Sequence, residues 1–229
     1  MRIRWDNLPF VGAGLLVAVG LLMAAANSAG QHAHQPPAPP PVPGAPIAMP
    51  PDRANDSYAI YSMLMPGQTF ASMAADQTSH WAIAEITVNV QDRNPAVPPQ
   101  GQLKPPSDNP RGFNEAVGDY NVNKNVRVRL TRNPFHIDHD FDLLAPDQVD
   151  ALRGSKAAGA NVSSEAREQW AGYPGVTYFS EVYFDKQHGA ALVYIDDWCA
   201  HLCASGTWVY LEKQGGHWVQ RSGITSGGA

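Results

Sequence analysis

Two cysteines and a histidine lie within five consecutive residues near the end of the chain, in Cys199-Ala200-His201-Leu202-Cys203. Thiolate and imidazole groups bind zinc and copper, so Cys199, His201 and Cys203 are candidate metal ligands that need at least one further donor. Outside the cytoplasm two thiols in one loop tend to oxidise, and a redox-cycling pair or inert free thiols are the remaining alternatives. We favour a structural Cys199–Cys203 disulfide, which closes a small ring and adds little stability through chain entropy, and we assign no metal.

A second group of candidate ligands lies upstream, where acidic and imidazole side chains are interspersed: His136, Asp138, His139, Asp140 and Asp142. In a strand the three aspartates share one face and His139 lies on the other. A calcium-binding EF-hand loop starting at Asp138 does not fit, because Leu143 occupies the glycine position and Val149 the final glutamate position. The pattern therefore predicts a solvated acidic strand face, with weak cation binding as the alternative.

The residues that commonly carry catalysis show no recognisable spacing. The chain lacks G-x-S-x-G, H-E-x-x-H, a P-loop and G-x-G-x-x-G. Asp196 and Asp197 are adjacent carboxylates, but neighbours in a strand point to opposite faces. We therefore assign no catalytic residue and no cofactor, and an uncharacterised hydrolase is the weakest functional alternative.

The elements that must position these residues are clearest at the C-terminus. Four β-rich runs, separated by turn-like or short connections, predict an antiparallel meander at residues 176–185, 190–198, 206–213 and 217–222. The cysteines occupy the connection between the second and third runs.

Upstream of the meander the hydrophobic pattern alternates between helical and strand periods. Capping residues Asn55-Asp56-Ser57 predict a helix that ends at Pro66-Gly67, and a Pro- and Asn-rich composition predicts a long exposed loop over 91–111. Together these segments predict one α+β domain over 55–229, with N-terminal helices and strands packed on the meander. The other expected helices are 111–121, 146–154 and 163–173, and the other expected strands are 81–90, 126–131 and 137–143.

The N-terminal part has no charged residue between Asp6 and Asp52. Basic Arg2 and Arg4, an apolar run over 8–26 and small residues after it predict that residues 1–30 are a signal peptide or an uncleaved membrane anchor. Prolines crowd the next stretch, so residues 31–54 are predicted to be a disordered, extended linker. Either alternative places the domain outside the cytoplasm, in the periplasm or extracellular space.

The charge balance bears on partners. The chain has 16 Lys and Arg against 21 Asp and Glu, a formal net charge of −5. Nucleic-acid-binding domains usually carry a basic excess, so we expect no nucleic acid partner. We expect membrane contact only through the N-terminal segment, if that segment is not cleaved.

One set of residues in the C-terminal half forms a recognisable pattern: Ala191-Leu192-Val193-Tyr194, Cys199, Leu202-Cys203, Gly206, Leu211-Glu212-Lys213, Gly216 and Trp218, with Tyr61-Ser62 and Asp119-Tyr120-Asn121 upstream. This pattern resembles that of an uncharacterised family of exported bacterial proteins, in which a strand ends in a C-x-x-L-C-G turn that leads to a strand bearing L-E-K and then to G-x-W. This chain has Ala204 at the expected glycine of the turn and an extra pair, Ala200-His201. The resemblance implies export and supports the fold, but it carries no activity; a weaker similarity links the meander to sheets of the nuclear-transport-factor-2-like fold.

The sequence therefore favours an exported, non-catalytic domain that binds a ligand or an envelope partner of unknown identity. A periplasmic metal-handling or thiol-redox protein centred on Cys199, His201 and Cys203 is the main alternative.

Overall fold

The computed structural model describes residues 44–65, 80–92, 96–157, 162–199 and 204–221. The chain divides into two units, residues 1–41 and 42–229, and all described residues belong to the second. The predicted leader (1–30), most of the predicted linker, and both His201 and Cys203 lie outside the described residues.

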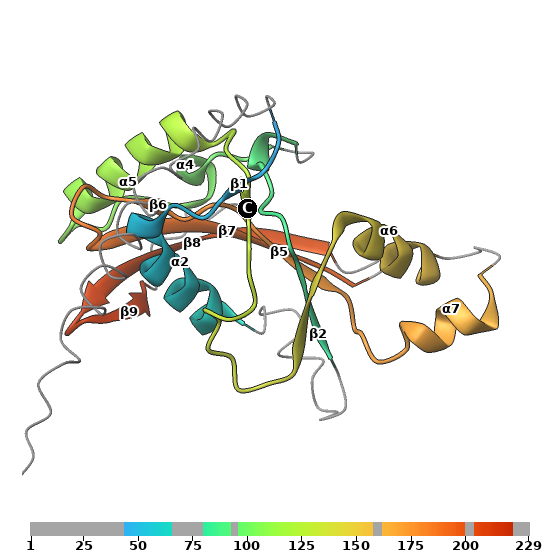
Figure 1. Cartoon of the computed structure of the whole chain (residues 1–229). Helices are drawn as coiled ribbons and strands as arrows, with labels where there is room; N and C mark the ends of the chain where they lie inside the picture. Colours follow the sequence, from blue (N-terminus) through green and yellow to red (C-terminus); the bar gives the residue numbers. More distant parts are fainter. Residues whose placement is uncertain (1–43, 66–79, 93–95, 158–161, 200–203, 222–229) are drawn as a thin grey trace, which may run out of the picture. The chain divides into compact units, whose positions relative to one another are not determined.

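A mixed sheet of seven strands organises the second unit in the order β4-β2-β5-β7-β8-β9, with β6 also paired to β7 (Figure 1). Neighbours from β5 to β9 run antiparallel, so the C-terminal meander is confirmed. β2 pairs in parallel with both β4 and β5, which the sequence analysis did not predict. The strand bounds are β2 Trp81–Ala84, β4 Phe141–Leu144, β5 Val176–Phe179, β6 Tyr183–Phe184, β7 Ala190–Trp198, β8 Ala204–Gln214 and β9 His217–Gln220.

Helices cover both faces of the meander, as Figure 1 shows for α2 on one side and α5 on the other. Alternate residues of a strand point to opposite faces. Accordingly, Val193 and Ile195 of β7 pack in the cluster that contains α2, whereas Leu192 and Tyr194 pack in the cluster that contains α5. The α+β class is thereby confirmed, with cores on both faces of the sheet. The helices on these faces are α2 Pro51–Leu64, α4 Pro99–Gln102 and α5 Pro110–Asn123.

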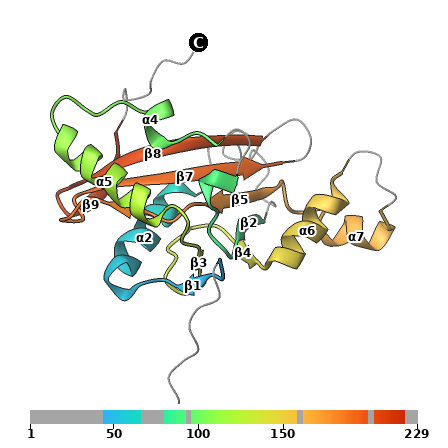
Figure 2. The ribbon, with the colours of Figure 1, turned by 90° about the horizontal axis from the view of Figure 1, so that it is seen from above.

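Two further helices connect β4 to β5 at the other end of the sheet (Figure 2). They pack beside Ala82, Ala84 and Tyr178 on the same face as α5. A separate two-stranded parallel sheet joins the start of the described chain to the segment after α5. The remaining bounds are α6 Pro146–Ser155, α7 Ser164–Gln169, β1 Ile47–Ala48, β3 Val128–Arg129 and the 3₁₀ turn η1 Val90–Asp92.

The predicted start of the first helix is wrong. α2 begins at Pro51, four residues before the predicted Asn55 cap, so the end of the predicted linker is helical and residues 47–48 form a strand. Proline suits the first helical position because that position needs no N–H donor and its fixed φ is already helical. The Pro50-Pro51 pair therefore marks a helix start.

The predicted loop over 91–111 is also only partly correct. It contains η1, α4 and the beginning of α5. Pro99 is buried and Leu103 is 4% exposed, so this segment packs against the sheet. The side chain of Asn109 accepts a hydrogen bond from the Gly112 N–H, which caps α5 where composition alone suggested loop.

The run expected as one strand over 176–185 is interrupted. Phe179 lies opposite Ile195, but Tyr183 lies opposite Leu192, so four steps on this strand match three on β7. One extra residue in an antiparallel pair is a β-bulge. The Ser180 hydroxyl fills the gap by accepting from the Tyr194 N–H at 2.9 Å and donating to the Glu181 carbonyl at 2.7 Å. The strand therefore splits into β5 and β6, with Glu181 at the bulge.

Candidate functional site

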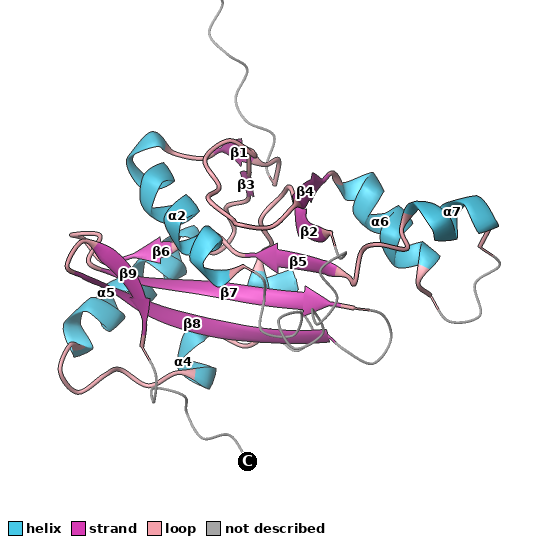
Figure 3. Ribbon diagram, turned by 90° about the horizontal axis from the view of Figure 1, so that it is seen from below, coloured by secondary structure: helices cyan, strands magenta, loops and turns pink. Residues whose placement is uncertain are grey.

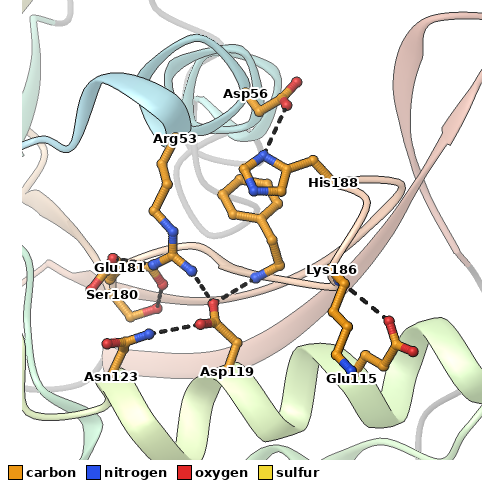
Figure 4. Close-up of polar contacts among 10 residues, drawn as sticks. Arg53, Asp56, Glu115, Asp119, Asn123, Ser180, Glu181, Lys186 and His188 are labelled. Atoms are coloured by element: carbon orange, nitrogen blue, oxygen red, sulfur yellow. Dashed lines mark hydrogen bonds and ion pairs between the residues drawn. The ribbon is translucent and has the colours of Figure 1, made fainter.

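The first turn of α2 carries Arg53, whose guanidinium lies between two carboxylates from distant parts of the chain (Figure 4). One nitrogen donates to Glu181 at the bulge and the other donates to Asp119 on α5. The Arg53, Glu181 and Asp119 side chains are 13%, 3% and 19% exposed. Buried charges persist when they are paired and hydrogen-bonded. This triad therefore connects both helical layers to the sheet between them.

Glu181 is the most deeply buried member of the triad. Its Oε1 accepts from Arg53, whereas Oε2 is buried and has no hydrogen-bond partner among the described residues. Burial raises the pKa of Glu181 because a charged carboxylate loses solvation, and the nearby Arg53 works against this rise. Glu181 is thus a carboxyl whose charge depends on one arginine.

Asp119 is held by more donors. Besides Arg53, it accepts from the Phe184 backbone N–H at 2.9 Å and from the Asn123 side chain at 2.7 Å. Asn123 is one helical turn further along α5, so the helix itself orients the carboxylate. The bond to Phe184 fixes β6 against α5.

The turn between β6 and β7 carries His188, which has a φ of 53°. This left-handed conformation is costly for most residues and is found more often for Asn, Asp and His. The imidazole stacks on the Phe184 ring, with centroids 4.4 Å apart and planes 11° apart. Its Nδ1 lies 3.5 Å from Asp56 on α2, and Asp56 also pairs with Lys213 Nζ at 2.7 Å. These contacts hold the strained turn against α2.

A surface cavity of about 460 Å³ lies beside these groups. Four of its lining side chains are carboxylates, and only Arg53 and Lys186 are permanently cationic. The Arg53 charge is already shared between Asp119 and Glu181. Within the described residues, Asp52 and Asp185 have no ion-pair partner. We call this the acidic cavity and define it by its lining residues: Asp52, Arg53, Glu115, Gly118, Asp119, Val122, Phe184, Asp185, Lys186 and His188.

Of the sequence-predicted metal and disulfide residues, the structure describes only Cys199, which does not line the acidic cavity. Cys199 directly follows β7 and is 8% exposed, while His201 and Cys203 lie outside the described residues, so the disulfide stays a prediction. Throughout the described ranges, no group of three His, Cys, Asp or Glu side chains is arranged to hold a metal ion.

The predicted acidic strand over 137–143 is corrected by the structure. β4 begins at Phe141, so Asp138 and Asp140 precede the strand and only Asp142 belongs to it. Asp142 accepts a hydrogen bond from the Tyr173 hydroxyl at 2.6 Å and lies 3.5 Å from Arg132. An acidic face shared by three aspartates is therefore not formed.

The sequence analysis identified neither the triad nor the acidic cavity beside it as a site. Arg53 fell within the predicted linker, and Glu181 fell within an uninterrupted predicted strand. One signal was available: Phe179, Val182 and Phe184 break the period of two, which indicates an extra residue between them. Asp119 appeared only as part of the family resemblance.

The mixed sheet, the triad and the acidic cavity together define an α+β domain with a polar surface site. Comparisons with protein-family models, with curated proteins and with solved structures find no match to this chain. Among the described residues, no helix is both long and apolar enough to cross a membrane.

Proposed function

We propose that this chain is an exported, non-catalytic binding domain and that the acidic cavity takes an organic cation, through an ammonium or guanidinium group. Export rests on the basic, apolar and small-residue pattern of residues 1–30. The binding role rests on one observation: the cavity has four carboxylates, and its most buried cation, Arg53, is already neutralised. A cationic group is therefore the complement of the charge that remains.

The geometry supports Asp52 and Asp185 as the recognising carboxylates. Asp185 Oδ1 accepts from the backbone N–H groups of Gly189 and Ala190 at 2.6 and 2.9 Å, so the turn fixes its orientation. Glu115 contributes less, because its Oε1 accepts from Arg111 Nε at 2.8 Å. The aromatic edge of the site is supplied by Phe184 and its stacked His188.

The test is calorimetric titration of the purified protein with N-acetyl-arginine amide, using N-acetyl-citrulline amide as the uncharged analogue of the same shape. We expect the cationic compound to bind and the citrulline compound to bind at least fivefold more weakly. Raising the salt from about 20 mM to about 300 mM shortens the Debye length and should weaken the binding of the cationic compound. Equal affinity for the two compounds would contradict the proposal.

Two variants place the binding in the acidic cavity. Asp52→Asn and Asp185→Asn each remove a charge and retain the side-chain carbonyl, so the Asp185 turn keeps its acceptor. Exposed charge pairs contribute about 0.2–1 kcal/mol each, which predicts a loss of affinity of roughly twofold to thirtyfold for the double variant. Asp138→Asn, an exposed aspartate outside the cavity, is the matched control and should leave the affinity unchanged.

A further inference from the structure

A second cavity, of about 290 Å³, lies at the carboxyl ends of the three parallel strands β4, β2 and β5. Leu144 ends β4, Ala84 ends β2 and Tyr178 lies near the end of β5, and all three line this cavity. In open sheets with parallel strands, ligands bind in the crevice outside the carboxyl ends of the strands. This position makes the cavity a candidate ligand site. It shares no lining residue with the acidic cavity.

One wall of the cavity is a face of α6. Pro146, Val149, Asp150 and Arg153 recur with helical spacing and all line the cavity. Figure 3 shows α6 beside β2 and β4, consistent with its contacts to β4. The opposite wall is the extended segment 84–89 that continues from β2.

The polar groups of the segment 84–89 are already bonded within the protein. Thr87 Oγ1 accepts from the Val128 N–H at 2.7 Å. Asn89 Oδ1 accepts from the Gln91 N–H at 2.9 Å, and its amide donates to Asn125 at 3.2 Å. These buried side chains need no ligand to satisfy them, so this wall offers mainly the apolar side chains of Ile86 and Val88.

The charges at the rim are balanced as well. Asp92 pairs with Arg127, and Glu85 pairs with Arg129 at 2.6 Å. On α6, Asp150 and Arg153 carry opposite charges, and the Arg153 guanidinium lies 5.1 Å from the centre of the Trp198 ring. A charged ligand of either sign therefore gains no net attraction here.

We infer that this cavity, which we call the strand-end cavity, binds a small, uncharged, largely apolar molecule of one or two rings. A cavity of roughly 150 Å³ lined by aliphatic and aromatic side chains can admit benzene. The strand-end cavity is about twice that size, which suits a fused pair of rings or a single substituted ring. Small-molecule sites combine apolar surface with a small number of polar groups that are free to bond the ligand. Here the apolar surface comes from Ala84, Ile86, Val88, Leu144, Pro146 and Val149, and many of the polar lining residues are already paired within the protein, as described above. This inference is independent of the cation site proposed above.

The experiment is methyl NMR of the purified protein titrated with indole, followed by the same titration with indole-3-acetate and tryptamine. We expect saturable shifts at the methyl groups of Ile86, Leu144 and Val149, and these same methyl groups should report no tighter binding of either charged analogue than of indole. Ile86→Trp should fill the cavity and weaken the binding of indole at least tenfold. Val219→Trp introduces the same ring at a position 39% exposed that lines neither cavity, and it should leave indole binding unchanged.

Several outcomes would overturn the inference. They are indole shifts located elsewhere, no saturable shifts, indole affinity in Ile86→Trp equal to that in Val219→Trp, or one charged analogue binding tenfold tighter than indole at the methyl groups of Ile86, Leu144 and Val149. If Ile86→Trp does not fold, the wild-type shift map still decides the location. Val88→Trp then fills the cavity from a second position on the same wall.

Discussion

Replacing Arg53 with methionine tests whether the triad is held by the arginine charge. Methionine keeps much of the apolar stem, but Glu181 loses the donor to its Oε1, while Oε2 already has none in the described structure. Asp119 keeps its bonds from Phe184 and Asn123. The loss of stability should therefore come mainly from the unpaired Glu181, whose side chain is 3% exposed.

The expected magnitude depends on pH. Removing one partner of a buried ion pair costs about 3–5 kcal/mol, whereas a buried neutral group left without a partner costs about 1–3 kcal/mol. Arg53→Met should thus lower the free energy of unfolding by about 4 kcal/mol where Glu181 is ionised and about 2 kcal/mol where it is protonated. The difference of about 2 kcal/mol corresponds to roughly 1.5 pKa units.

The direction of the pH dependence follows from the proton balance. Arg53 lowers the pKa of Glu181 against the effect of burial. Without Arg53 the folded-state pKa rises further above the unfolded-state value, so the folded variant holds a proton that the unfolded chain releases. Stability of the variant relative to wild type is then greatest below the unfolded-state pKa and falls as the pH rises through the folded-state pKa.

Urea denaturation at about pH 4.5 and about pH 7.5 measures how much Arg53→Met lowers the free energy of unfolding at each pH. The double variant Arg53→Met with Glu181→Gln should recover about 2 kcal/mol at the higher pH, because the uncompensated charge is gone. Arg53→Met with Asp119→Asn is the matched control and should recover little. An equal loss at the two pH values, or equal rescue by the two amides, would refute the assignment to Glu181.

Three other perturbations give separate expectations. Burial and the hydrogen bond to Asp142 raise the pKa of Tyr173 to about 12, so its contribution to stability should be lost as the pH rises from about 10 through about 12; absorbance titration should show Asp142→Asn lowering this pKa. In urea denaturation, the free energy of unfolding of His188→Ala should be about 1 kcal/mol lower than that of His188→Gly, because only glycine adopts the positive φ without strain. Gly206→Ala should cost about 1–3 kcal/mol, since a Cβ there overlaps the Tyr194 ring, and calorimetric melting would show no loss if the strand can shift.

Local patterns were sufficient to predict the meander and the helices α5, α6 and α7. Their hydrophobic periods of two or near 3.6 are set by neighbours within a few residues of one another. The turn at Gly215-Gly216 was equally predictable, because a two-residue hairpin loop favours residues that accept a positive φ and glycine does so readily. Both glycines do adopt a positive φ in this loop.

The triad and the acidic cavity beside it could not be predicted in the same way. Arg53 and Glu181 are 128 positions apart, and Arg53 and Asp119 are 66 apart. The parallel pairing of β2 with β4 and β5 joins segments with no turn between them, so it leaves no local signature. The Pro50-Pro51 pair was assigned to a linker because the proline-rich segment before it outweighed the local preference for proline at a helix start.

The bulge at Glu181 connects the stability argument to the proposed function. When Glu181 is ionised, the triad has a net charge of −1, because two carboxylates share one guanidinium. Glu181→Gln makes the triad neutral and should weaken the binding of N-acetyl-arginine amide at the acidic cavity, whereas Arg53→Met removes a positive charge and should strengthen that binding. If Arg53 instead bound an anionic ligand, the two variants would have the opposite effects on binding. Calorimetric titration of both folded variants distinguishes the cationic ligand from the anionic one. A tighter complex with Glu181→Gln than with Arg53→Met would overturn the cation assignment while leaving the account of the triad's stability intact.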